Sequence, residues 1–184
     1  MGLLTVLRDV KEKEKEMRIL ILGLDNAGKT TTIKRIKGED VDKISPTVGF
    51  TITSFDFLSF KLNIWDVGGQ RTIRSYWRNY YEKTDGIIWV VDCSDRRRIE
   101  SCQKEFFELL AAEKLEGASL LVLANKQDIA GAMTPKEVVK HLKLDDVKRR
   151  HWRVQKASAM TGFGLKEGFD WLVDDISKRI FIYD

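Results

Sequence analysis

The sequence predicts an α/β fold: a mostly parallel sheet of six strands, with one antiparallel hairpin at its edge and helices on both faces. Two observations predict it. Short apolar runs rich in β-branched residues alternate along the chain with segments in which apolar residues recur every three or four positions. The runs are typical of strands buried on both faces, and the segments are typical of helices that cover a sheet. Alternating strands and helices build a parallel sheet.

Each element can be located in order. The strands are predicted at residues 19–22, 51–57, 60–66, 86–91, 120–124 and 152–156. The helices are predicted at residues 29–36, 99–112, 135–142 and 165–181. Only Leu58 and Ser59 separate the second strand from the third, so these two strands form the edge hairpin. Pro135 suits a first helical turn, and Thr134 before it suits an N-cap.

Length and composition indicate one globular domain. A chain of 184 residues with 43% hydrophobic residues can bury a single core. We assign residues 17–184 to this domain and residues 1–16 to an N-terminal amphipathic helix and linker. The basic clusters at residues 96–98 and 148–150 contain no aromatic residues and belong to no nucleic-acid module. They are interpreted as solvated loops, and nucleic-acid binding is not expected.

The cysteines and the hydropathy indicate a mainly soluble, cytoplasmic protein, expected to be monomeric. Cys93 and Cys102 are the only cysteines and form no Cys-x-x-Cys motif, which is typical of reduced thiols in the cytosol. No apolar run approaches the roughly 18 residues that span a bilayer.

Residues 23–30 form a glycine-rich loop, Gly-Leu-Asp-Asn-Ala-Gly-Lys-Thr, between a predicted strand and a predicted helix. In this context the backbone N–H groups point at phosphate oxygens, and the helix N-terminus adds the positive end of its dipole. Lys29 is expected to reach the β- and γ-phosphates. The residues expected to bind the phosphates are Gly23, Leu24, Asp25, Asn26, Ala27, Gly28, Lys29, Thr30 and Thr31.

A magnesium site is predicted beside this loop. Thr30 and Thr47 can each offer a hydroxyl oxygen to Mg²⁺. Asp66 ends a predicted strand at the sheet edge where ligands bind, and it is expected to reach the ion through water. Gly69 permits a close approach to the γ-phosphate. Gln70, which follows it, is the predicted catalytic residue because it can orient the attacking water.

A second motif, Asn-Lys-Gln-Asp at residues 125–128, follows a buried strand and is expected to bind guanine. Asp128 can accept from both N1–H and the exocyclic amine of guanine, and adenine offers neither donor in that place. Asn125 is expected to bond the base and tie its loop to the phosphate loop. The stem of Lys126 is expected to lie along the purine face.

A third, weaker signal completes the predicted nucleotide site. Ser158 and Ala159 follow the last predicted strand, and the Ala159 N–H is expected to meet the 6-keto oxygen of guanine. In this order the three segments describe the phosphate end and the base end of one bound GTP or GDP with Mg²⁺.

These motifs resemble those of the Ras-superfamily small GTPases and, within them, the ADP-ribosylation factor (Arf) and Arf-like branch. The likeness covers essentially the whole chain and rests on residues 23–31, 45–50, 65–70 and 125–128. It implies a P-loop small GTPase domain that cycles between GDP- and GTP-bound states. Its mobile segments would be residues 37–50 and 67–81, served by activating and exchange proteins.

The resemblance also implies how such a switch is read. The edge hairpin would slide between nucleotide states and displace the N-terminal helix when GTP binds. Phe50, Trp65 and Tyr80 would form an aromatic effector surface, although core packing explains Trp65 equally well. The implied effectors are tubulin-folding cofactors, hence microtubule biogenesis, and carriers of lipidated cargo. The implied localisation includes cytoskeletal, centrosomal or mitochondrial pools.

Slow intrinsic hydrolysis is expected. Residues 37–50 contain no arginine, and a transition-state arginine is worth roughly 10³–10⁵ in rate. An activating protein would supply it, with Arg71 and Arg74 as the only candidates within this chain.

The N-terminal residues predict a short amphipathic helix. Its apolar residues precede the charged residues 11–16 and are Leu3, Leu4, Val6, Leu7 and Val10. Such a helix can lie on a membrane or in a groove of its own domain, and we favour the groove. Arf proteins carry an acyl chain at the position of Gly2. Because Val6 replaces the Ser or Thr of the acceptor pattern, myristoylation is not expected, and membrane contact is at most weak and peripheral.

Two alternatives compete with a regulatory GTPase. A small-molecule kinase would need a lid and an acceptor pocket, whereas the switch and hairpin segments fill the space after the phosphate loop. A nucleotide-dependent interaction module with negligible turnover is disfavoured by the presence of Thr47 and Gln70.

Overall fold

The computed structural model describes residues 2–6 and 15–180. The strands are β1 (Glu16–Leu22), β2 (Phe50–Phe57), β3 (Phe60–Val67), β4 (Gly86–Asp92), β5 (Ser119–Asn125) and β6 (Trp152–Lys156). The α-helices are α2 (Lys29–Ile36), α3 (Ile99–Leu110), α4 (Pro135–His141) and α5 (Leu165–Ile180). Short 3₁₀ helices are η1 (Arg74–Tyr80), η2 (Arg96–Arg98), η3 (Glu113–Leu115) and η4 (Leu144–Asp146).

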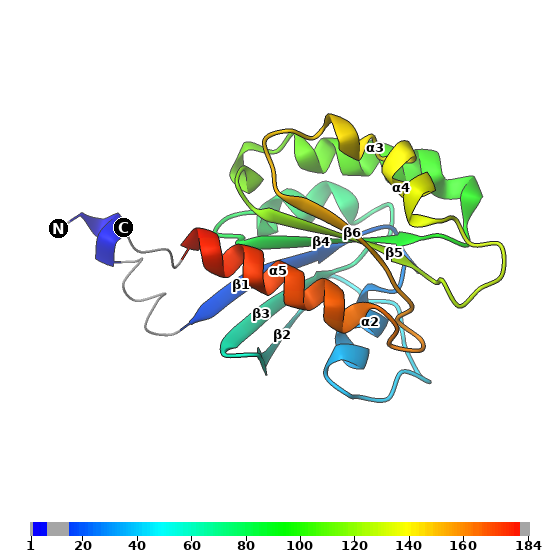
Figure 1. Ribbon diagram of the computed structural model, residues 1–184, viewed down its shortest axis with the longest axis horizontal. Helices are drawn as coiled ribbons and strands as arrows, with labels where there is room; N and C mark the ends of the chain where they lie inside the picture. Colours follow the sequence, from blue (N-terminus) through cyan, green and yellow to red (C-terminus); the bar gives the residue numbers. More distant parts are fainter. Residues whose placement is uncertain (1, 7–14, 181–184) are drawn as a thin grey trace.

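The strands form one six-stranded sheet in the order β2-β3-β1-β4-β5-β6 (Figure 1). β2 and β3 pair antiparallel, and all other neighbours pair parallel. The two-residue turn at Leu58 and Ser59 joins the hairpin as predicted. The predicted α/β fold with an antiparallel edge hairpin is confirmed. Because the parallel strands β1, β3, β4 and β5 end at the same edge, the loops that follow them meet there.

An apolar core lies on each face of the sheet. α3 and α4 cover one face, and α2 and α5 cover the other (Figure 1). In the first core the rings of Trp89 and Phe106 pack with their centroids 5.4 Å apart. In the second core Phe169 is fully buried with the apolar side chains of β1. The prediction of helices on both faces is confirmed.

The element boundaries differ modestly from the predicted ones. β1 begins three residues early, at Glu16, because Met17 is also fully buried in the second core. α3 ends at Leu110 and α4 at His141, each before its predicted last residue. Thr134 caps α4 as predicted: its hydroxyl accepts from the N–H of Glu137 at 3.2 Å. The predicted end of the last helix, Phe181, lies outside the described residues.

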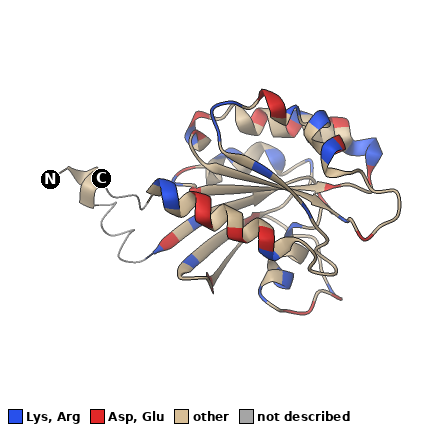
Figure 2. Cartoon of the chain, viewed as in Figure 1, with Lys and Arg blue, Asp and Glu red and all other residues tan. Residues whose placement is uncertain are grey.

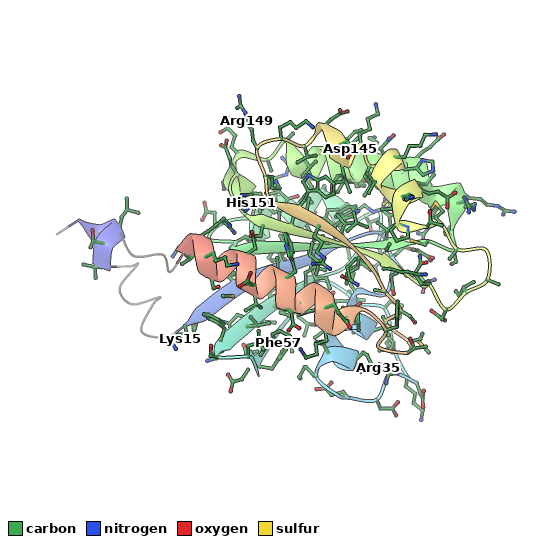
Figure 3. The ribbon with its side chains drawn as sticks, in the orientation of Figure 1. Lys15, Arg35, Phe57, Asp145, Arg149 and His151 are labelled. Atoms are coloured by element: carbon green, nitrogen blue, oxygen red, sulfur yellow. The ribbon has the colours of Figure 1, made fainter. Side chains whose placement is uncertain are left out.

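The basic clusters are not simply solvated loops, so that prediction is wrong for one residue in each. Charged residues lie mostly on helices and loops (Figure 2), and Arg149 points away from the body (Figure 3). Arg150, however, donates to the carbonyls of Leu115 and Ala118 at 2.6 and 3.0 Å. Arg98 is held in ion pairs with Asp95 and Asp25.

The N-terminal residues begin a helix, but it is not docked in a groove of the domain. Residues 3–6 are helical, with the side chains of Leu3 and Leu4 76% and 83% exposed. The groove that we favoured is therefore not occupied by these residues. Leu7, Val10 and residues 11–14 of the predicted helix and linker lie outside the described residues. Within the described parts of the chain, no helix is long and apolar enough to cross a membrane.

Candidate nucleotide-binding site

The predicted phosphate loop lies between β1 and α2, and its lysine is buried. Lys29 is 6% exposed, and its Nζ donates to the carbonyls of Gly23 and Leu24 at 3.0 and 2.9 Å. Burial lowers the pKa of this ammonium to about 8, which the nearby carboxylate of Asp66 only partly offsets. Gly28 has φ +103°, and a Cβ there would lie 2.3 Å from Nδ2 of Asn125, so only glycine fits.

A cleft of about 360 Å³ opens in front of this loop. Its lining combines the loop and the start of α2 with the segments that precede β2 and follow β3. The lining residues are Asp25, Asn26, Ala27, Gly28, Lys29, Thr30, Thr31, Ile44, Ser45, Pro46, Thr47, Gly68, Gly69 and Gln70. The structure thus brings the predicted phosphate-binding residues 25–31 and the predicted catalytic Gln70 to one cavity, whereas Gly23 and Leu24 do not line it.

The three predicted magnesium residues meet at one end of the cleft. The Thr30 hydroxyl donates to Oδ2 of Asp66 at 2.6 Å, and the hydroxyls of Thr30 and Thr47 lie 2.9 Å apart. Oδ1 of Asp66 is buried and has no hydrogen-bond partner among the described residues. Burial raises the pKa of the Asp66 carboxyl, against the opposing hydrogen bond from Thr30. Two hydroxyls and an unpartnered carboxylate oxygen form a hard oxygen set of the kind that Mg²⁺ prefers, so these residues fit the ion.

Gln70 lies at the same end of the cleft, directly after Gly69. Its Oε1 is buried without a hydrogen-bond partner among the described residues, which leaves an acceptor for a small polar molecule. Gly69 packs against the phosphate loop: a Cβ there would lie 2.4 Å from Nζ of Lys29 and 2.5 Å from the Asp25 nitrogen. No larger residue fits this position without displacing the loop.

The predicted base-binding motif follows β5 and is tied to the phosphate loop. Nδ2 of Asn125 donates to the carbonyl of Ala27 at 2.8 Å. Nζ of Lys126 donates to the carbonyl of Asn26 and to Oδ2 of Asp92, both at 2.7 Å. The expected link between the two loops is therefore present and is made by two side chains, those of Asn125 and Lys126.

The predicted third segment packs against the base-binding motif. The Ser158 hydroxyl donates to Oδ1 of Asp128 at 2.8 Å, which orients that carboxylate. The Ala159 N–H donates to Oδ1 of Asn125 at 2.9 Å. A guanine oxygen would therefore have to share this N–H with Asn125, a constraint that the sequence did not reveal.

Comparison with known proteins agrees with this geometry. The chain matches the ADP-ribosylation factor family over residues 3–176. The chain belongs to this family. The protein named ADP-ribosylation factor-like protein 2 is 58% identical over 184 residues in Dictyostelium discoideum and 60% identical over 185 residues in Arabidopsis thaliana. Each of these alignments covers 100% of both chains.

A solved structure extends the similarity to the fold. The Arl6 BBS3 small GTPase from Trypanosoma brucei, with the bound nucleotide analogue GppNp, is 32% identical to this chain with a TM-score of 0.83. The match covers 89% of this chain and 98% of that chain. This Arf-family protein is accordingly a small GTPase that binds GTP or GDP with Mg²⁺ and hydrolyses GTP.

Three arginines of this Arf-family GTPase support the site and were missed or misjudged from the sequence. Arg98 donates to the Asp25 carboxylate at 2.8 Å, and Arg35 donates to the carbonyl of Ala159 at 3.3 Å. Arg74 was considered a source of transition-state charge. Its Nε instead donates to the carbonyl of Gly69 at 2.9 Å, and its guanidinium also contacts Asp25 and Glu105. No motif spacing marks these contacts, because most of them join residues far apart in the chain.

The predicted aromatic surface of the Arf-family chain is a single ring cluster. Phe50 and Trp65 stack with centroids 5.4 Å apart, and Tyr80 lies 5.1 Å from Phe50 and 5.9 Å from Trp65. Phe50 is 45% exposed, so the cluster reaches the surface. The guanidinium of Arg18 lies 4.1 Å from the centre of a Trp65 ring and supports it by a cation–π contact.

Proposed function

We propose that this GTPase is a molecular switch whose output is effector binding in the GTP state and whose hydrolysis depends on an activating protein. The observation that carries the proposal is the meeting of Thr30, Thr47 and Asp66 beside Gln70. Thr47 belongs to the segment before β2, and Gln70 to the segment after β3. The same ion and phosphoryl group can therefore hold both segments, and loss of that phosphoryl group releases them.

The geometry supports a role for each residue. Lys29 and the loop N–H groups would bind the phosphates, with the hydroxyls of Thr30 and Thr47 on Mg²⁺ and Asp66 reaching it through water. Mg²⁺ neutralises charge on the β- and γ-phosphate oxygens when bound. Gln70 would accept a hydrogen bond from the attacking water through its unpartnered Oε1 and orient it. Lys29, Thr30, Thr47 and Gln70 line one cleft, and Asp66 is hydrogen-bonded to Thr30 behind it, which supports a single catalytic arrangement.

At the base end, Asp128 would accept from N1–H and the 2-amino group of guanine. Among the described residues only Ser158 donates to this carboxylate, at Oδ1, which leaves Oδ2 for the base. Lys126 would lie along the purine, and Asn125 would keep the base loop at a fixed distance from the phosphate loop. Ala159 would offer its N–H to the base oxygen as a shared donor.

The hairpin would transmit the state of the nucleotide to partners. β2 and β3 carry Phe50 and Trp65, and Tyr80 follows from η1, so movement of the hairpin changes the ring cluster. By resemblance, the partners are tubulin-folding cofactors and carriers of lipidated cargo. We also propose residues 17–184 as the GTPase domain of a monomeric protein that is mainly cytoplasmic, with cytoskeletal, centrosomal or mitochondrial pools.

A state-dependent binding experiment tests the proposal. The purified chain is loaded with GDP or with a non-hydrolysable GTP analogue, immobilised and exposed to a cell extract. The proteins bound to each form are then identified. Enrichment of a defined set on the triphosphate form, lost in the Phe50→Ala variant, supports the switch. Equal binding to both forms would contradict it, and calorimetry with GTP and ATP checks base discrimination independently.

A further inference from the structure

The phosphate loop of this protein carries a carboxylate, Asp25, close to where anionic phosphates bind. Like charges repel, so an unpaired carboxylate in this place opposes nucleotide binding. Two arginines converge on Oδ1 of Asp25. Nη1 of Arg98 donates to it at 2.8 Å, and Nη2 of Arg74 donates to it at 3.2 Å. The phosphate loop is thus held by two arginines, Arg98 and Arg74, that are not part of the loop.

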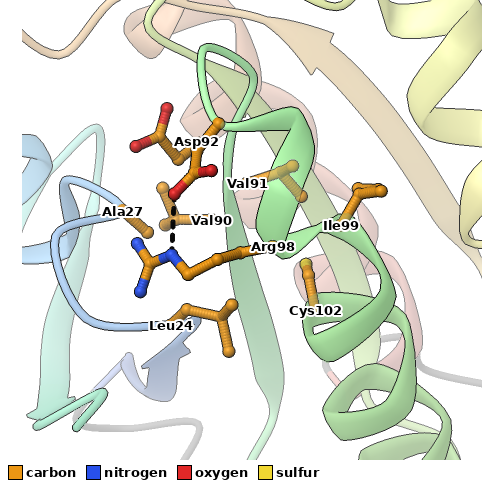
Figure 4. A pocket seen from close by; sticks show the side chains of 9 residues that line it. Leu24, Ala27, Val90, Val91, Asp92, Arg98, Ile99 and Cys102 are labelled. Atoms are coloured by element: carbon orange, nitrogen blue, oxygen red, sulfur yellow. Dashed lines mark hydrogen bonds and ion pairs between the residues drawn. The ribbon is translucent and has the colours of Figure 1, made fainter.

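Arg98 holds both the side chain and the backbone of Asp25. Its Nη2 donates to the Asp25 carbonyl at 2.7 Å, and its Nε donates to Oδ2 of Asp95 at 2.7 Å. The Arg98 guanidinium lies beside the loop that carries Leu24 and Ala27 (Figure 4). All three nitrogens of this planar fork therefore have a partner.

The two arginines belong to different parts of the fold. Arg98 immediately precedes α3, which is fixed in the core by the fully buried Phe106. Arg74 begins η1 in the segment expected to move with the nucleotide, and its side chain is 10% exposed. Asp25 thus contacts Arg98, which is fixed beside the core helix α3, and Arg74, which would move away with its segment.

Arg74 also fixes Gly69 against the phosphate loop. The carbonyl of Gly69 accepts from Nε of Arg74 at 2.9 Å and from the Asp25 N–H at 3.0 Å. Gly69 lies so close to Lys29 that a Cβ would come within 2.4 Å of Nζ. A terminal phosphoryl group that contacts Lys29 needs this space, so Gly69 must retreat and break both bonds.

We propose that Arg98 is a positioning residue that holds the phosphate loop through Asp25 for either nucleotide, and that Arg74 is a positioning residue that favours the diphosphate state. This inference rests on the proposed assignment of Lys29 to the phosphates. Neither arginine lines the phosphate cleft, so each would act through Asp25 or Gly69.

Dissociation rates of fluorescently labelled GDP and of a labelled non-hydrolysable GTP analogue test both roles. Arg98→Ala is expected to speed release of both nucleotides by about ten-fold, the effect of losing a charge-assisted hydrogen bond. Arg98→Lys is expected to give release rates between those of the wild type and of Arg98→Ala, since an ammonium cannot make all the hydrogen bonds of the planar guanidinium. Arg74→Ala is expected to speed GDP release several-fold more than release of the triphosphate analogue.

Matched controls come from the same segments. Arg97→Ala removes a neighbouring cation beside Arg98, and Arg78→Ala removes one from η1 whose Nε bonds only locally, to the carbonyl of Ser75. Both controls are expected to behave as the wild type. Thermal melting in saturating GDP identifies a variant that fails to fold. For such a variant, Arg98→Lys or Arg74→Lys is measured instead.

Three results would overturn the inference. Arg98→Ala with release rates equal to those of Arg97→Ala would refute the role of Arg98. Arg74→Ala with an equal change for both nucleotides would refute the diphosphate preference. Arg98→Ala with an undiminished effect in an Asp25→Asn background would show that Arg98 does not act through that carboxylate. A wild-type chain that does not bind guanine nucleotides would instead refute the proposed function.

Discussion

The hydroxyl of Thr30 donates to the carboxylate of Asp66 at 2.6 Å, across 36 positions of the chain. Thr30 lies in the first turn of α2, and Asp66 lies at the end of β3, which pairs parallel with β1. The contact therefore depends on the sheet order, which places these strand ends side by side. It leaves Oδ1 of Asp66 buried and unpartnered among the described residues, so this oxygen could accept from a water bound to Mg²⁺.

Nucleotide release should depend on Mg²⁺ through Asp66. We expect chelation of Mg²⁺ to speed GDP release at least about ten-fold, because Thr30 would hold the nucleotide through the ion that it coordinates. Burial raises the pKa of Asp66, so its carboxylate takes up a proton at a higher pH than an exposed aspartate does. The protonated form does not hold the ion, so the Mg²⁺ effect should weaken as the pH falls. Release rates at several pH values, with Asp66→Asn as the metal-insensitive control, check this prediction.

Nucleotide affinity should fall as the pH rises through the pKa of Lys29. Burial lowers this pKa to about 8 in the nucleotide-free protein, so a growing fraction of Lys29 is neutral above that pH. Bound phosphates favour the ammonium form, and binding near pH 8 should therefore take up protons. Calorimetry in buffers of different ionisation enthalpy measures this uptake. The Lys29→Met variant should bind weakly with no uptake, and an equal uptake by that variant would exclude Lys29 as its source.

The fold and the ends of the nucleotide site could be predicted from the sequence because their signals are local. Strands and helices follow apolar periodicity, and the loops at residues 23–30 and 125–128 each place several functional residues at fixed spacing. The glycine-rich loop with Lys29 is thereby assigned to phosphate, and the segment with Asp128 is assigned to the base. The local spacing also sufficed for the cap at Thr134.

The supporting contacts could not be predicted because they depend on tertiary structure. Arg98 lies in a run of three arginines that looks like a solvated loop, yet it reaches Asp25 across 73 positions. The role of Arg74 was misjudged for the same reason, since its contacts with Gly69 and Asp25 require the folded switch segment. The sharing of the Ala159 N–H with Asn125 likewise appears only when β5 and β6 are paired.

Asp128→Asn should change base preference from guanine toward xanthine. The amide can donate to the 2-keto oxygen of xanthine, whereas it cannot accept both guanine protons as a carboxylate does. We expect the affinity for GTP to fall by about a hundred-fold or more and the affinity for xanthosine triphosphate to rise. Competition binding of the two triphosphates measures this. Unchanged GTP affinity in this variant would exclude Asp128 as the base-reading residue.

The purified protein should hydrolyse GTP slowly. Arg74 is held by Gly69, Asp25 and Glu105, and residues 37–50 contain no arginine. The other candidate, Arg71, is exposed and does not line the phosphate cleft, so no contact among the described residues directs it to the γ-phosphate. We expect single-turnover hydrolysis on the order of 10⁻³ s⁻¹ or slower, and roughly 10³–10⁵ faster with an activating protein. Gln70→Leu should remove the stimulated reaction and leave GTP binding intact. Fast unassisted turnover would mean that the chain supplies its own cation.

The ring cluster should decide effector binding without affecting nucleotide binding. Phe50, Trp65 and Tyr80 pack on one another beside the hairpin, and none of them lines the phosphate cleft. Truncation of a central aromatic anchor commonly costs about 2 kcal/mol or more in binding. We therefore expect Phe50→Ala to weaken effector binding at least about 30-fold, with GDP and GTP release rates unchanged.

A matched variant distinguishes a specific surface from a loss of exposed apolar area. Leu58 lies at the tip of the same hairpin and is 62% exposed, but it is not part of the ring cluster. Leu58→Ala should bind effectors as the wild type does. Only the ring cluster combines residues of the hairpin with a residue of η1, so only the cluster would change when both segments move. Titration calorimetry with an effector recovered from the triphosphate-loaded protein provides the comparison. Equal losses in Phe50→Ala and Leu58→Ala would mean that the hairpin as a whole, rather than the ring cluster, forms the contact.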